Sequence, residues 1–174
     1  MKKNFLLIYV IAFAITMQSC SSDSYNEEPL SDVVEIRGTQ DYVAGLNSVL
    51  KDGLTKSVND QEDTIVPELL LLSKEYLNNN NIDYCEFFGD SEDDRIIVFA
   101  LALAEYNKIV YYNSITRTTV GGCVLQAMGL RALVQGKGIT RAAIISLGKA
   151  IAKKAVPYLG WGLFAIDMAM CIAE

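Results

Sequence analysis

Histidine is absent from the 174-residue sequence. The commonest general base, the commonest metal ligand and the base of a Ser-His-Asp triad are therefore missing together. The sequence also has no Walker A loop, no GxSxG nucleophile elbow and no Rossmann glycine fingerprint. We therefore expect no enzymatic activity, no catalytic residue, no cofactor and no metal site.

Proline is scarce as well, with three residues, while 51% of the chain is hydrophobic. Few prolines and many aliphatic residues favour a packed helical protein over a disordered one. We predict an all-α fold, a helical bundle of about six short helices.

The N-terminus has the features of an export signal. Lys2 and Lys3 precede an uncharged, largely apolar stretch over residues 5–17. That stretch is shorter than the roughly 20 apolar residues that cross a bilayer and has the length of a signal-peptide core.

Met17-Gln18-Ser19-Cys20 resembles the lipobox of bacterial lipoproteins, in which a cysteine is diacylated and becomes the new N-terminus. The resemblance implies that residues 1–19 are a cleaved signal peptide and that acyl chains such as palmitate anchor Cys20 to membrane lipid in the bacterial cell envelope. An ordinary secretory signal and an uncleaved anchor are the alternatives. The sequence does not indicate which membrane or leaflet would carry the anchor.

Three further cysteines would meet an oxidising compartment after export. Cys123 and Cys171 bracket the apolar C-terminal region, so we predict a disulfide between them and a free thiol at Cys85. The alternative is that all three are small buried apolar residues. No pair has CxxC or zinc-ligand spacing, which agrees with the absence of a predicted metal site.

Charge divides the chain after the predicted signal peptide. Residues 20–119 contain 19 acidic and 7 basic residues, whereas residues 120–174 contain 2 acidic and 6 basic ones. Such asymmetry indicates interaction with a membrane or a partner. We predict a flexible tether over residues 20–38, an acidic helical domain over residues 39–119 and a cationic apolar helical module over residues 120–174.

Hydrophobic spacing predicts the first helices. A helix over residues 41–58 has one apolar face and is weakened by Gly45 and Gly53. Pro67 suits the first position of a second helix, which ends before the asparagines at residues 78–81.

Ser91 is predicted to cap a third helix over residues 92–112. The acidic residues that follow Ser91 suit the first turn of a helix. They also suggest a calcium site, but the ligand spacing of an EF-hand is missing.

Three more helices are predicted in the C-terminal region, over residues 120–135, 141–156 and 157–173, the second of them capped by Thr140. The second has an apolar face opposite Lys149 and Lys153. The third is apolar almost all round, as is typical of a helix buried at the centre of a bundle.

Residues 121–174 resemble the compact, cationic, Gly/Ala-rich helical bacteriocins in texture, and Gly121-Gly122 before Cys123 resembles a double-glycine processing site. The resemblance implies a membrane-active module that the acidic domain masks and that cleavage releases. Lys149, Lys153, Lys154 and Trp161 would then contact the membrane.

Two other functions remain open on the sequence alone. One is a structural or partner-binding lipoprotein with a single helical core, and the other is an immunity-type lipoprotein whose acidic half captures a cationic toxin. Nucleic acid is not an expected partner, because the chain is acidic overall and its basic residues lie among aliphatic ones.

Overall fold

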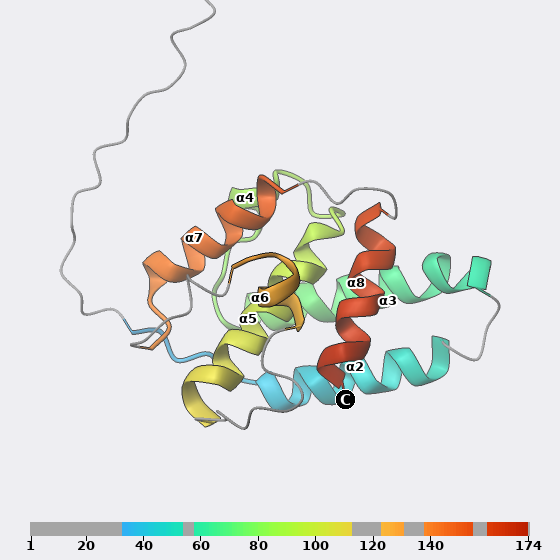
Figure 1. Cartoon of the computed structure of the whole chain (residues 1–174), viewed down its shortest axis with the longest axis horizontal. Helices are drawn as coiled ribbons and strands as arrows, with labels where there is room; N and C mark the ends of the chain where they lie inside the picture. The colour runs from blue at the N-terminus through green and yellow to red at the C-terminus, as the bar shows by residue number, and fades with distance from the viewer. Residues whose placement is uncertain (1–32, 54–57, 113–122, 131–137, 155–159, 174) are drawn as a thin grey trace, which may run out of the picture. The chain divides into compact units, whose positions relative to one another are not determined.

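The computed structural model describes residues 33–53, 58–112, 123–130, 138–154 and 160–173. Over these residues the chain forms seven helices and no strand, which confirms the predicted all-α fold. One isolated antiparallel bridge joins Val33 to Thr140. The helices belong to one compact unit that begins at Ser31 (Figure 1).

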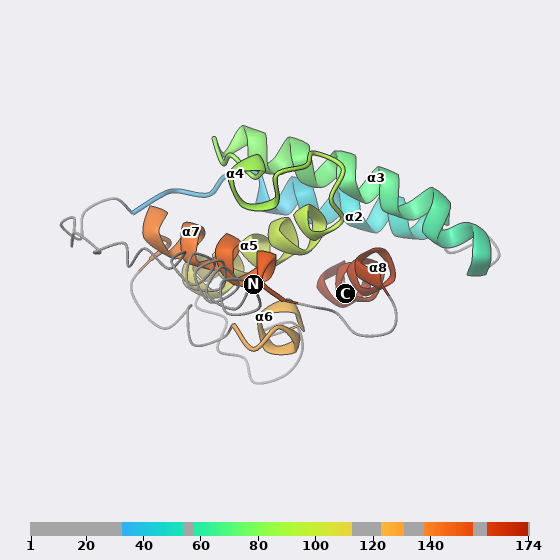
Figure 2. The same cartoon turned by 90° about the horizontal axis from the view of Figure 1, so that it is seen from above.

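Helices α2 (Thr39–Gly53) and α3 (Val58–Asn79) lie side by side and run in opposite directions (Figure 1, Figure 2). Gly45 and Gly53, which were expected to weaken α2, allow this close approach. A Cβ on Gly45 would lie 2.9 Å from Leu72, and one on Gly53 would lie 2.3 Å from Ile65. The glycines therefore serve the packing of the helix pair.

Pro67 lies inside α3, so the prediction of a helix that begins there is wrong. The buried residues on both sides of the proline, Ile65, Val66, Leu69 and Leu70, form one continuous apolar face. Helix α3 contacts α2 and α5, and this face lies in the core. These tertiary contacts outweigh the cost of an interior proline, about 3 kcal/mol.

Helix α5 (Arg95–Tyr112) is the central helix of the fold, with every residue from Ile96 to Asn107 buried. It contacts α2, α3, α6, α7 and α8. The prediction that the last helix is central is therefore wrong. Helix α8 (Gly160–Ala173) buries only one face and leaves Asp167 exposed.

Helix α5 begins three residues later than the sequence pattern predicts, and Ser91 does not cap it. The side chain of Asp93 instead accepts a hydrogen bond from the backbone N–H of Arg95 at 2.9 Å. Asp93 also forms an ion pair with the guanidinium of Arg95. Ser91 was favoured because serine and aspartate are both good residues at a helix start, and the sequence alone does not choose between them.

A short helix, α4 (Cys85–Phe88), lies between α3 and α5 along the chain. Phe87 and Phe88 each make an edge contact with the ring of Phe99 in α5, at centroid distances of 5.5 and 5.9 Å. Cys85 is an exposed free thiol. The aromatic contacts fix this segment on the core.

Helix α6 (Cys123–Ala127) is much shorter than the predicted helix over residues 120–135. It ends at a turn in which Gly129 has φ +64°, a conformation that glycine adopts without strain. Residues 131–137 lie outside the described part of the chain.

Helix α7 (Arg141–Ala152) confirms the predicted cap, because the Oγ1 atom of Thr140 accepts a hydrogen bond from the N–H of Ala143. Its buried face carries Ile144, Leu147 and Ile151. Gly148 on the same helix lets the ring of Phe87 approach, since a Cβ there would lie 2.7 Å from that ring.

Residues 33–38 pack on the folded unit, so the predicted tether ends earlier than residue 38. The N–H of Val34 donates to the carbonyl of Ile139 at 2.7 Å, and Ile36 is buried. The side chain of Asn80 holds both backbone groups of Arg37, accepting from its N–H and donating to its carbonyl. The polar composition of residues 20–38 indicated a tether and gave no sign of this pairing.

Candidate functional site

The predicted disulfide between Cys123 and Cys171 is present, with the two Cα atoms 6.1 Å apart. It joins α6 to α8 across a sequence separation of 48 residues. Cys20, Gly121 and Gly122 lie outside the described residues, so lipidation and processing stay predictions.

The predicted membrane-contact residues lie on two elements. Lys149 is exposed on α7, and Lys153 and Lys154 are exposed just after it. Trp161 is half-buried on α8, where its ring makes an edge contact with Phe164 at 6.1 Å. In the described part of the chain no helix is long and apolar enough to cross a membrane. Membrane contact by these four residues stays a prediction.

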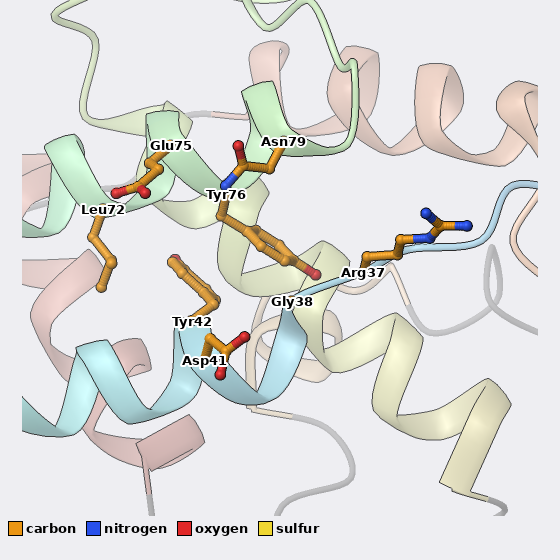
Figure 3. Close-up of a pocket in the computed structure, with 8 residues that line it drawn as sticks. All are labelled: Arg37, Gly38, Asp41, Tyr42, Leu72, Glu75, Tyr76 and Asn79. Atoms are coloured by element: carbon orange, nitrogen blue, oxygen red, sulfur yellow. The ribbon is translucent and has the colours of Figure 1, made fainter.

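A pocket of about 450 Å³ lies between α2 and α3 (Figure 3). Its volume falls in the range of small-ligand sites, roughly 300–1,000 Å³. The lining residues come from the start of α2 with the segment before it and from the second half of α3, and they are Arg37, Gly38, Asp41, Tyr42, Leu72, Glu75, Tyr76 and Asn79.

Two stacked tyrosines form the floor of this pocket. The rings of Tyr42 and Tyr76 are 4.4 Å apart with an interplanar angle of 10°, and both side chains are buried. Each hydroxyl is hydrogen bonded inside the protein, that of Tyr42 to Ser73 and that of Tyr76 to Thr39, both at 2.9 Å. The floor is therefore rigid and presents ring carbons to the pocket.

A second layer of hydrogen bonds fixes the floor to the central helix. The Nδ2 atom of Asn107 in α5 donates to the Oγ1 of Thr39 at 2.7 Å and to the carbonyl of Ile36 at 3.1 Å. Since Thr39 also bonds Tyr76, α5, α3 and the start of α2 share one network. Such a network holds the pocket in one shape.

The rim of the pocket is charged. Asp41 and Glu75 are exposed, and Figure 3 shows their carboxylates on either side of the ring of Tyr42. Neither carboxylate has a hydrogen bond or ion pair among the described residues. The guanidinium of Arg37 extends away from them and pairs with Glu35 at 2.9 Å, which raises the pKa of Arg37.

The tyrosine floor predicts instability at alkaline pH. Burial raises the pKa of Tyr76 to about 12 and raises that of Tyr42 further, although hydrogen bonds from Thr39 and Ser73 oppose the shifts. In the unfolded chain both hydroxyls titrate near pH 10. Between pH 10 and 12 the unfolded chain therefore loses protons that the native protein keeps, so the free energy of unfolding falls as pH rises.

We expect a loss on the order of 2 kcal/mol by pH 12 from Tyr76 alone. Urea unfolding at pH 8, 10 and 11.5 measures it. The double variant Tyr42→Phe and Tyr76→Phe should be less stable than the wild type at pH 8 but should decline less steeply above pH 10. An equal decline in both proteins would contradict the role of the pair.

Glu105 is a fully buried acid on the central helix α5. Its Oε2 atom accepts hydrogen bonds from the N–H groups of Val124 and Leu125, at 2.9 and 3.1 Å. These are the first-turn amides of α6, next to Cys123 of the disulfide. The carboxylate thus holds α6 on the core, which is a structural role.

Replacing Glu105 by alanine would leave two buried N–H groups without acceptors. We expect Glu105→Ala to lower the free energy of unfolding by about 3 kcal/mol. Urea unfolding measures the loss, and amide hydrogen exchange at Val124 and Leu125 should accelerate. Glu105→Gln, which keeps one acceptor oxygen, serves as the milder control. A cost below about half a kcal/mol would show that α6 is held by other contacts.

No group of three or more metal-ligating side chains occurs among the described residues. The acidic residues near the start of α5 have other partners, since Asp90 accepts from the N–H of Glu92 and Glu92 pairs with Lys74. The Lys74 ammonium lowers the pKa of Glu92. Through these contacts the acidic residues before α5 stabilise the local structure.

No protein family, curated protein or solved structure matches this chain. A functional proposal therefore rests on the geometry and on the sequence.

Proposed function

We propose that the protein is a lipid-anchored binding protein of the bacterial cell envelope, with a single helical core and no enzymatic activity. The pocket between α2 and α3 is its partner surface. The observation that carries the proposal is this preformed pocket, whose rigid floor and unpaired carboxylates lie in the acidic part of the chain. The anchor is the part of the proposal that rests on the lipobox-like sequence before Cys20.

The packing of the C-terminal helices supports a single core over a masked membrane-active module. Helix α8 contacts α2, α3 and α5, and its buried face consists of Gly162, Ala165, Ile166, Ala169 and Ile172. The ammonium of Lys108 in α5 also donates to the carbonyl of Ile172. A module that is released intact would have to break these contacts, and the acidic helices would lose their cover.

Intact-mass spectrometry of the native protein tests the proposal. We expect one membrane-bound species of residues 20–174 that carries acyl chains and gains two mass units on reduction of the disulfide. The Cys20→Ser variant should lose the acyl mass and leave the membrane fraction. A supernatant fragment that starts near Cys123 would overturn the proposal in favour of the released module.

A further inference from the structure

We propose that the pocket between α2 and α3 receives an arginine or lysine side chain from a basic segment of a partner protein. This inference rests on the proposed binding function and names the class of its partner.

The charge of the pocket is negative. Of the three charged residues that line it, Arg37 points away from the two carboxylates and forms an exposed ion pair with Glu35, at 2.9 Å (Figure 3). Asp41 and Glu75 remain, both exposed and without a partner in the described part of the chain. A cation between these carboxylates would be attracted by both, whereas an anion would be repelled.

The two carboxylates differ in what they do for the fold. Asp41 lies in the first turn of α2, where the helix dipole stabilises a carboxylate. Glu75 lies near the C-terminal end of α3, whose last turn contains no basic residue. The helix dipole does not stabilise Glu75 there, and its exposed carboxylate makes no hydrogen bond or ion pair within the described residues. The carboxylate is therefore accessible to a cation from a partner.

The floor suits the long apolar stem of a basic side chain. Both tyrosine hydroxyls are used by Ser73 and Thr39, so the rings of Tyr42 and Tyr76 offer carbon and no free donor. Arginine and lysine carry three or four methylene groups before the charged end. Because Tyr42 and Tyr76 are only 3 and 4% exposed, the methylenes would pack mainly on half-buried Leu72 and cover the small exposed part of the rings, while the charge reaches the carboxylates.

An apolar contact lies beside the pocket. Leu71 is 69% exposed, although most large hydrophobic residues of the fold are buried. Leu71 and Glu75 are four residues apart in α3, so their side chains are neighbours on the helix surface. A basic residue with an apolar neighbour in the partner segment would contact both, and this favours a peptide over a small free cation.

Calorimetric titration of the detergent-solubilised native protein tests the inference. The probes are four capped five-residue peptides with a central Leu-Arg, Leu-citrulline, Leu-Glu or Gly-Arg pair. Citrulline has nearly the shape of arginine but no charge. We expect the arginine peptide to bind with an affinity that falls as the salt concentration rises. The citrulline peptide should bind at least about five-fold more weakly.

Two matched variants locate the binding. Asp41→Asn with Glu75→Gln removes two charges from the pocket, and Asp63→Asn with Glu68→Gln removes two from exposed positions of α3 outside it. The first pair should lower the affinity for the arginine peptide about five-fold or more, and the second pair should leave that affinity nearly unchanged. Leu71→Gln should weaken the Leu-Arg peptide but not a Gly-Arg peptide.

Three results would overturn the inference. Equal losses of affinity for the arginine peptide in the two double variants would mean that the peptide is attracted to the acidic surface in general and not to the pocket. A glutamate or citrulline peptide that binds as tightly as the arginine peptide would leave the binding function standing and remove its cationic class. No heat with any peptide would also remove the basic segment as the partner, while the proposed anchoring is decided separately by the intact mass.

Discussion

Removal of the Cys123–Cys171 disulfide should lower the free energy of unfolding by about 4 kcal/mol. The bond closes a loop with a sequence separation of 48 residues, and in the chain-entropy description a loop of that size constrains the unfolded chain by this amount. The double variant Cys123→Ser and Cys171→Ser, unfolded in urea beside the wild type with and without reductant, measures the effect.

The free thiol provides the matched control. Cys85 is exposed in the short helix α4, so Cys85→Ser should leave stability within about half a kcal/mol of the wild type. Reductant should destabilise Cys85→Ser as much as the wild type and leave the double serine variant unchanged. A double variant as stable as the wild type would mean that Glu105 and the core contacts alone hold α6 and α8 in place.

A protein that ends after residue 119 should not fold. It lacks α6, α7 and α8, and with them the buried residues that cover the central helix α5. Each large aliphatic side chain buried in the core contributes about 1.5 to 3 kcal/mol. The lost helices carry several of them, including Leu125, Ile144, Leu147, Ile151, Ile166 and Ile172. For these six residues the sum is about 9 to 18 kcal/mol, as large as the usual net stability of a domain, about 5 to 15 kcal/mol.

Circular dichroism and thermal unfolding of the truncated protein test this expectation. The full chain with Cys85→Ser, purified in the same way, controls for handling. Low helicity without a cooperative transition is the expected result. A cooperatively folded protein of residues 20–119 would instead support an independent acidic domain and revive the masked membrane-active module.

The helices of the fold were largely predictable because hydrophobic spacing and local caps determine them. Thr140 caps α7 through a contact three residues away, which the sequence displays directly. Pro67 was misread because the continuation of α3 depends on packing against α2 and α5. The central position of α5 likewise depends on how the other helices surround it. The sequence favoured α8 for that position because α8 is the more uniformly apolar segment of the two.

The pocket could not be predicted, because its residues come from separate helices. Tyr42 and Tyr76 each fit the apolar face of a helix, and nothing in either segment indicates that their rings stack. The charge asymmetry did indicate a partner surface in the acidic half, but it did not select Asp41 and Glu75 from 19 acidic residues. The close approach of α2 to α3 at the site depends on Gly45, where a Cβ would lie 2.9 Å from Leu72 of the pocket.

If Cys20 is lipidated as proposed, the pairing of Val34 with Ile139 limits the distance between the folded unit and the membrane. The packed unit is reached by Val33, thirteen residues after Cys20. If Cys20 is lipidated as proposed, a fully extended connection spans at most about 45 Å. Arg37 and the pocket follow Val33 within a few residues, so such an anchor would hold the pocket close to the bilayer. A partner in solution would meet it there, and one on the same membrane would find it at a high local concentration.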